Sequence, residues 1–288
     1  MKRLLFTITL TLLTLSSQAQ LLWKVSGNGL EKDSYILGSA HIAPPSLIDE
    51  IPGLNDAIKN CDLAIGEVVK SDRDDMDKYL MFAPPDSTLD VLLSPEDYQI
   101  VEAVVNKRFE SHPGVTLDRL RMLKPNVLAY LLDILEVQEL DEIEELFDYA
   151  VLERAAEAGH ETTGFETPEA HNAIFFDCSL TDQAAWLLKQ CKDCDEQGID
   201  EGVDVYEAYL RQDSIELFEE TAEDESEEKR LEIFLYARNR NWIADLVPMM
   251  STGTSCLVVV GIGHLPGEKG LLQLLRNQGF TVTPVTAE

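Results

Sequence analysis

Two similar motifs near opposite ends of the chain place the strongest constraint on its fold. Gly38-Ser39-Ala40-His41 follows the apolar run 35–37, and Gly261-Ile262-Gly263-His264 follows the apolar run 256–260. Each run is typical of a short buried strand, so each motif delivers a histidine just beyond a strand end. Ligands of open α/β sheets bind beyond the carboxyl ends of the strands. We therefore expect the two imidazoles to meet at one site.

The pattern around these motifs predicts an α/β fold. Strand-like segments occur at 22–25, 35–37, 63–68, 161–166, 256–260 and 281–284, and helical patterns at 48–60, 143–158 and 268–278. The order strand, motif, helix, strand near the end is typical of a βαβ unit. We expect a central mainly parallel or mixed sheet flanked by helices. Helical patterns interrupted by prolines further predict a large helical insertion at about 71–145 within a single domain, 20–288.

The first 19 residues have the pattern of a secretory signal peptide. Lys2 and Arg3 precede an apolar run at 4–15, and Ser17-x-Ala19 offers small residues for cleavage. The run is too short to span a bilayer, and no later stretch approaches the roughly 20 apolar residues that a span requires. The sequence therefore predicts an exported protein, periplasmic or extracellular, with no integral membrane segment in the mature chain.

The acidity of the chain bears on its partners. Its formal net charge is −30, which excludes nucleic acid and anionic membrane surfaces as expected partners. The densest acidic runs, 139–145 and 216–228, lie within helical patterns and are interpreted as solvated helix faces. The composition does not indicate an oligomeric state.

Five cysteines are an odd number for an exported protein. Cys191 and Cys194 form the only close pair, and the absence of a second such pair argues against a zinc ribbon. This pair ends a helical run among acidic residues, whereas redox pairs favour a helix start. A local disulfide is the favoured interpretation, and unpaired or otherwise paired thiols are the alternative.

Four titratable residues are expected at the strand ends: His41, Glu67, Glu166 and His264. Mixed imidazole and carboxylate ligands suit divalent zinc, manganese, cobalt or iron, which activate water for hydrolysis. The alternatives are structural histidines or a noncatalytic ligand site, with the two glutamates capping the helices that follow them. Arg238 lies in an apolar helical pattern and is expected either to support an anionic transition state or to be a solvent-exposed arginine.

Several of these segments also carry a family resemblance. The matching pieces, in order, are 22–25, 35–41, Glu67, 88–94, 124–125, 164–167, Arg238-Asn239 with Trp242, and 261–265. The chain resembles the TraB/GumN family, related to the Tiki metalloproteases. The resemblance implies a fold similar to erythromycin esterase and ChaN-like proteins, and manganese or cobalt as the metal, with zinc as a further candidate.

By position, the resemblance makes His41, Glu67 and His264 the active site. Its supporting residues are Glu166, Arg238, Asn239, Gly38 and Gly261. The chain departs from the family pattern at Ser39-Ala40, where a bulkier pair is common, and at His171, where glutamine is usual.

These observations lead to one functional hypothesis and two rivals. The chain is predicted to be an exported metal-dependent hydrolase of a peptide or small-molecule substrate, with peptide cleavage as the leading reaction. His41 and His264 would hold the metal with Glu67 and Glu166, Glu67 would be a ligand or general base, and Arg238 would stabilise the oxyanion. The rivals are a noncatalytic haem or small-ligand binding protein and a cell-surface interaction protein with a relict site.

Overall fold

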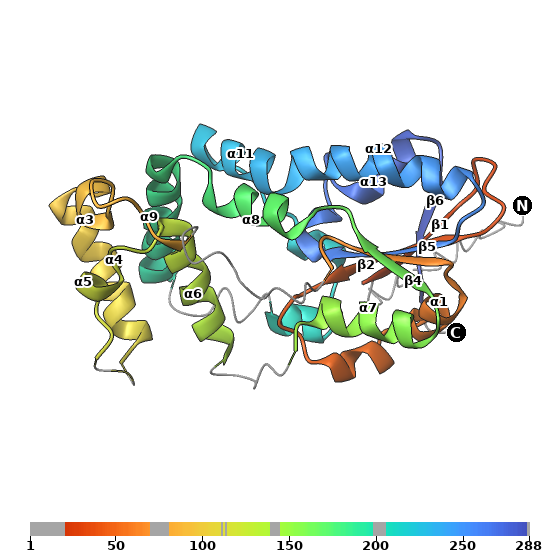
Figure 1. Ribbon diagram of the computed structural model, residues 1–288, viewed down its shortest axis with the longest axis horizontal. Helices are drawn as coiled ribbons and strands as arrows, with labels where there is room; N and C mark the ends of the chain where they lie inside the picture. Colours follow the sequence, from red (N-terminus) through yellow and green to blue (C-terminus); the bar gives the residue numbers. More distant parts are fainter. Residues whose placement is uncertain are drawn as a thin grey trace, which may run out of the picture.

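A six-stranded mixed sheet forms the centre of the fold (Figure 1). The computed structural model describes residues 21–69, 81–110, 112, 114–138, 145–197 and 206–286. The strand order is β4-β3-β5-β2-β1-β6. β4, β3, β5 and β2 pair in parallel, and β1 pairs antiparallel with both β2 and β6. The α/β prediction is confirmed. The strands are β1 (Leu22–Ser26), β2 (Ser34–Ser39), β3 (Leu63–Gly66), β4 (Glu161–Gly164), β5 (Cys256–Gly261) and β6 (Thr281–Pro284).

The last strand differs from the expected βαβ unit. After helix α13 (Leu271–Asn277), the chain passes over β2 and β1, and β6 pairs antiparallel with β1 at the far edge. β6 therefore runs in the same direction as β5 but is not its neighbour. The predicted strand–helix–strand order is present, and only the pairing differs.

Helices cover both faces of the sheet (Figure 1). α1 (Leu54–Asn60) and α7 (Phe147–Glu157) cover one face, and α12 (Ala237–Ser251) and α13 cover the other. The strands are apolar because they are enclosed on both sides: Leu37, Ile65 and Val259 are fully buried.

The helix predicted at 48–60 is divided in two. A 3-10 turn, η1 (Pro45–Asp49), precedes α1, and Gly53 lies between them with φ 73°. A positive φ interrupts a right-handed helix and is most accessible to glycine. The Pro52-Gly53 pair is therefore the physical reason for the break.

A second group of helices lies at the end of the molecule away from the sheet (Figure 1). It contains α3 (Leu89–Leu92), α4 (Pro95–Arg108), α5 (Leu117–Leu120), α6 (Pro125–Gln138) and α9 (Leu180–Gln197). These helices share a small core of their own, in which Val101, Leu128 and Leu187 are fully buried. α9 lies outside the predicted insertion of 71–145, yet it completes this core. The insertion is therefore stabilised by a helix from a later part of the chain.

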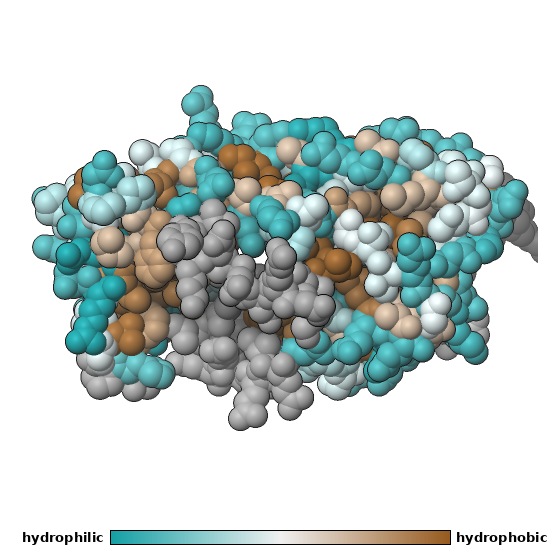
Figure 2. Space-filling view, in the orientation of Figure 1, coloured by the Kyte–Doolittle hydropathy of each residue, from teal (hydrophilic) through white to brown (hydrophobic). Residues whose placement is uncertain are grey.

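The surface agrees with the acidic composition. Figure 2 shows hydrophilic residues over much of the visible face, with apolar residues appearing between the helices at the α3–α5 end. No helix among the described residues is both long and apolar enough to cross a bilayer. Residues 1–20 lie outside the described part, so the signal peptide stays a prediction. The same holds for the Cys191–Cys194 disulfide, because the side chain of Cys194 is outside that part.

Candidate active site at the strand ends

The predicted site residues converge at one edge of the sheet. Glu67 directly follows β3, Glu166 lies two residues beyond β4, and His41 lies two residues beyond β2. His264 ends a short 3-10 turn, η4 (Ile262–His264), that continues from β5. These four strands are parallel neighbours, so their carboxyl ends share one edge. Arg238 of α12 contacts Glu67, Glu166 and His264 from the face of the sheet that α12 covers.

The two motifs contact each other through their glycines. A Cβ on Gly38 would lie 3.0 Å from Cγ1 and 3.2 Å from Cα of Ile262, so the second motif packs directly against the first. A Cβ on Gly261 would lie 3.4 Å from Nε2 of His41 and 3.3 Å from Oε1 of Glu67. We call this point the Gly261 cradle. Gly38 is thus needed for close approach, and the space beside Gly261 is bordered by Nε2 of His41 and Oε1 of Glu67.

Arg238 connects the carboxylates and the second histidine. Its Nε donates to Oε1 of Glu166 at 2.8 Å, and its Nη2 donates to Glu67 and, at 3.0 Å, to Oε2 of Glu166. Its Nη1 donates to the Phe234 carbonyl at 3.0 Å and to Nε2 of His264 at 3.2 Å. A guanidinium has five N–H groups, and all five have protein acceptors here. These contacts favour a positioning role for Arg238 over the predicted oxyanion role.

A π-helical turn places this arginine. The turn η3 (Glu232–Tyr236) lies between α11 (Glu225–Leu231) and α12, and it contains Phe234, whose carbonyl accepts from Arg238. π-helical turns are rare and occur frequently at functional sites. The guanidinium also lies 4.7 Å from the ring centre of Trp242, one turn further along. The helix that carries Arg238 is therefore locally adapted to the site.

Glu67 is buried and Glu166 is partly buried, yet both are ionised. Burial opposes ionisation of Glu67, but the charges of Arg238 and His41, with the Gly261 amide at 2.8 Å, hold its pKa well below the usual range. Burial also opposes ionisation of Glu166, but hydrogen bonds from His171 and Arg238 lower its pKa. Burial likewise disfavours the charge on Arg238, and the two carboxylates raise its pKa above the ordinary value. Glu67, Glu166 and Arg238 together therefore carry two negative charges around one positive charge.

Glu166 does not cap the helix that follows it. Thr167 performs that role for α8 (Pro168–Phe176), its hydroxyl accepting from the Ala170 amide. Glu166 instead accepts from Arg238 and, at 3.1 Å, from Nε1 of Trp242. Of the alternatives open at the sequence level, the arrangement thus favours a shared cluster.

His264 is enclosed and uses both ring nitrogens. Its Nδ1 lies 2.7 Å from Oδ1 of Asn239, whose Nδ2 donates to the carbonyls of His264 and Lys269. Asn239 therefore accepts at Oδ1, which places the ring proton on Nδ1 and leaves Nε2 to accept from Arg238. Burial lowers the pKa of His264 to about 3, against the opposing effect of Glu67. The ring is neutral and forms one hydrogen bond with Asn239 and another with Arg238.

His41 differs from His264 in environment and partner. Its side chain is 53% exposed, and its Nδ1 lies 2.7 Å from Oδ2 of Asp148. The charge of Asp148 and its hydrogen bond raise the pKa of His41 to about 9. With Nδ1 directed at a carboxylate, Nε2 is the nitrogen that faces the Gly261 cradle. The two histidines of similar motifs are therefore not equivalent.

The sequence interpretation missed two contributors. Asp148 begins α7 among the buried apolar residues Phe147, Val151 and Ala155, and a lone carboxylate on such a face was the available signal. The second is His171, which the sequence analysis names only as a departure from the family pattern; its Nδ1 lies 2.9 Å from Oε2 of Glu166. Its position one turn beyond Glu166 was the only indication.

The predicted four-ligand metal centre does not fit this arrangement. Arg238 and Asn239 occupy both ring nitrogens of His264, and Arg238, His171 and Trp242 surround the oxygens of Glu166. No group of three or more histidines, cysteines or acids in the described part of the chain has the geometry to hold a metal ion. The donors that still face a common point are Nε2 of His41 and Oε1 of Glu67.

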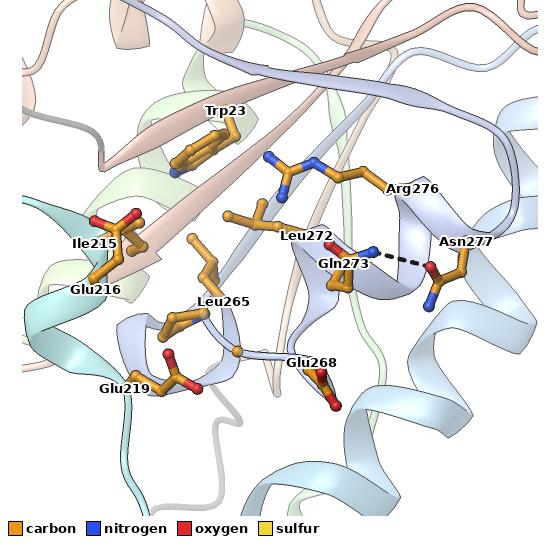
Figure 3. A pocket seen from close by; sticks show the side chains of 12 residues that line it. Trp23, Ile215, Glu216, Glu219, Leu265, Glu268, Leu272, Gln273, Arg276 and Asn277 are labelled. Atoms are coloured by element: carbon orange, nitrogen blue, oxygen red, sulfur yellow. Dashed lines mark hydrogen bonds between the residues drawn. The ribbon is translucent and has the colours of Figure 1, made fainter. Parts of the chain in front are cut away.

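A separate cavity of about 710 Å³ lies beside β1, α13 and the turn η2 (Ile215–Phe218) (Figure 3). Its lining includes Trp23, Glu219, Glu268 and Arg276, and the guanidinium of Arg276 lies 5.6 Å from the Trp23 ring centre. It is not lined by the strand-end cluster, the name used here for His41, Glu67, Glu166, Arg238 and His264. The cavity is therefore distinct from the candidate active site.

Comparison with known families places the chain. The TraB/PrgY/gumN family pattern matches residues 21–284, from the start of β1 to the end of β6. The chain belongs to the TraB/PrgY/gumN family. The match contains both glycine–histidine motifs and every residue of the strand-end cluster, and it confirms the family resemblance seen in the sequence. No curated protein and no solved structure matches the chain.

Proposed function

We propose that this TraB/PrgY/gumN family member is a hydrolase that cleaves a peptide, or a small-molecule ester or amide, at the strand-end site. The observation that supports this is the convergence of Nε2 of His41 and Oε1 of Glu67 on the Gly261 cradle. An imidazole backed by a carboxylate and a second, ionised carboxylate provide the acid and the base that acyl transfer to water requires. They lie at the sheet edge where α/β proteins bind ligands.

In this mechanism, Glu67 acts as the base and His41 as the acid. Water in the cradle gives one proton to Oε1 of Glu67 while its oxygen attacks the substrate carbonyl carbon. His41, which Asp148 keeps protonated, gives its Nε2 proton to the leaving nitrogen or oxygen as the acyl bond breaks. The proton on Glu67 then returns to His41 through solvent, which restores both groups. Arg238 holds Glu67 in place and favours its ionised form.

The predicted divalent metal, manganese, cobalt or zinc, is not used in this mechanism. Among the described residues, Nε2 of His41 and Oε1 of Glu67 are the two nitrogen or oxygen ligands beside the Gly261 cradle, and structural and catalytic metal sites ordinarily use three or more protein ligands. We expect hydrolysis to persist after treatment with EDTA. Loss of activity with EDTA and its recovery with manganese or cobalt would replace the acid–base mechanism with a metal-dependent one.

The test is hydrolysis of a mixed library of internally quenched peptides together with p-nitrophenyl acetate. Wild-type protein should cleave at least one probe, and His41→Ala and Glu67→Gln should each lower its kcat/KM at least about 100-fold. His160→Ala and Glu161→Gln are matched controls, because both residues lie at the amino end of β4, on the opposite edge of the sheet. No cleavage by the wild type, or equal losses in the controls, would reject the proposal.

A further inference from the structure

We propose that Asp148 is a positioning residue for His41, which fixes the imidazole so that Nδ1 carries a proton toward α7 and Nε2 faces the reacting group. The inference deepens the proposed function and rests on it for its catalytic meaning. Its structural content, the orientation and tautomer of one ring, is independent of the substrate.

The first turn of α7 holds His41 at two points. The Phe147 amide donates to the His41 carbonyl at 2.8 Å, and the Asp148 carboxylate lies 2.7 Å from Nδ1 of the ring. The backbone and the side chain of His41 are thus fixed by consecutive residues of one helix. Because the backbone and Nδ1 of His41 are both held, the side chain loses the rotation about its side-chain bonds that would otherwise exchange the positions of its two ring nitrogens.

The carboxylate of Asp148 is itself fixed. Its second oxygen accepts from the Ser39 hydroxyl at 2.5 Å, and Asp148 is only 8% exposed. Tyr209, also buried, donates to the Gly38 carbonyl at 3.1 Å and holds the same motif from another side. Ser39, Asp148 and His41 therefore form a chain of hydrogen bonds that begins in the core and ends at the cradle.

A purely structural role would leave a different pattern. An acid in the first turn of a helix commonly caps backbone amides there, but both oxygens of Asp148 face the first motif instead. His264 supplies the internal comparison. Its Nδ1 faces the neutral amide of Asn239, which supports an uncharged ring, whereas Nδ1 of His41 faces a carboxylate, which supports a charged one.

The experiment combines NMR with kinetics. Long-range ¹H–¹⁵N spectra of histidine-labelled protein, followed above the His41 pKa, report which nitrogen of the neutral ring keeps its proton. We expect Nδ1–H in the wild type and a shift toward Nε2–H in Asp148→Ala, which removes the acceptor. On the probe that the wild type cleaves, Asp148→Ala should lower kcat about 10²- to 10⁴-fold and change KM less than about threefold. Asp148→Glu should recover part of the loss.

Two further variants guard against a folding artefact. Ser39→Ala keeps the carboxylate and removes only its buried donor, so it should lower kcat about tenfold with the tautomer unchanged. Asp62→Asn removes a carboxylate that accepts from the Ser255 amide at the other edge of the sheet, and it should leave kcat unaltered. Nε2–H in neutral wild-type His41, or an unchanged tautomer in Asp148→Ala, overturns the inference. Absence of hydrolysis with Nδ1–H retained rejects only the proposed function.

Discussion

Replacing Gly261 with alanine tests the cradle with one methyl group. The backbone of Gly261, at φ −51° and ψ 137°, is accessible to any residue, so alanine fits without strain. The added Cβ would lie 3.3 Å from Oε1 of Glu67, 3.4 Å from Nε2 of His41 and 3.6 Å from Cδ2 of His264. The methyl group would therefore occupy the position that water and the substrate carbonyl need.

We expect Gly261→Ala to change the stability of the protein little and to lower its activity strongly. Removing a glycine where the backbone permits alanine stabilises a protein by about 0.4–1 kcal/mol through the unfolded state. The tight contacts to Glu67 and His41 oppose this gain, so we expect the free energy of unfolding to change by less than about 1 kcal/mol. Displacing reacting groups by about 1 Å can cost roughly 100-fold in rate, and we expect kcat/KM to fall at least that much.

The assay compares Gly261→Ala with Gly263→Ala by thermal unfolding and by hydrolysis of the same probe. A Cβ on Gly263 meets only Oε1 of Glu220 at 3.5 Å and Cδ1 of Leu235 at 4.0 Å, so this variant should keep activity within about threefold. Full activity in Gly261→Ala would refute the cradle as the reaction site. A loss of activity matched by a large loss of stability would refute the steric reasoning.

Two further predictions concern protonation and the principal binding rival. His264 has a pKa of about 3 in the fold against 6.5 when unfolded, so the unfolded chain binds more protons between these values. Stability should be complete above pH 6.5 and fall by several kcal/mol as the pH approaches 3, and urea unfolding at several pH values should show a weaker dependence in His264→Gln. Haem added to the protein should give no Soret spectrum of bis-histidine ligation, because His264 is enclosed and both of its ring nitrogens are hydrogen-bonded; such a spectrum, lost in both His41→Ala and His264→Ala, would favour haem binding instead.

The strand ends could be predicted because their signals are local. Each apolar run stops at a motif or a lone carboxylate, and parallel pairing then brings Glu67, Glu166 and the two histidines to one edge. The apolar strand patterns and the two glycine–histidine motifs can be recognised without knowing any distant contact. The protonation and role of each residue could not be predicted in the same way. They depend on which of its polar atoms are already hydrogen-bonded to residues from distant parts of the chain.

Asp148 and Arg238 illustrate that limit. Asp148 is separated from His41 by more than a hundred residues, and the segment between them gives no local sign of their pairing. The π-helical turn before Arg238 has no sequence pattern of its own, yet it supplies the Phe234 carbonyl that takes one of the arginine N–H groups. The sequence thus predicted His41, Glu67, Glu166, Arg238 and His264 but not Asp148 or His171. The structure adds these two residues and distinguishes the exposed His41 from the enclosed His264.

The most direct test of the central claim is a double-mutant cycle between His41 and Glu67. The claim is that these two residues act on one reacting group as a unit. Effects of residues that act as a unit are strongly non-additive. kcat/KM should therefore be nearly as low in His41→Ala or Glu67→Gln alone as in the double variant, with all three proteins folded. Losses that multiply independently, or a single variant that keeps wild-type kcat/KM, would contradict the account.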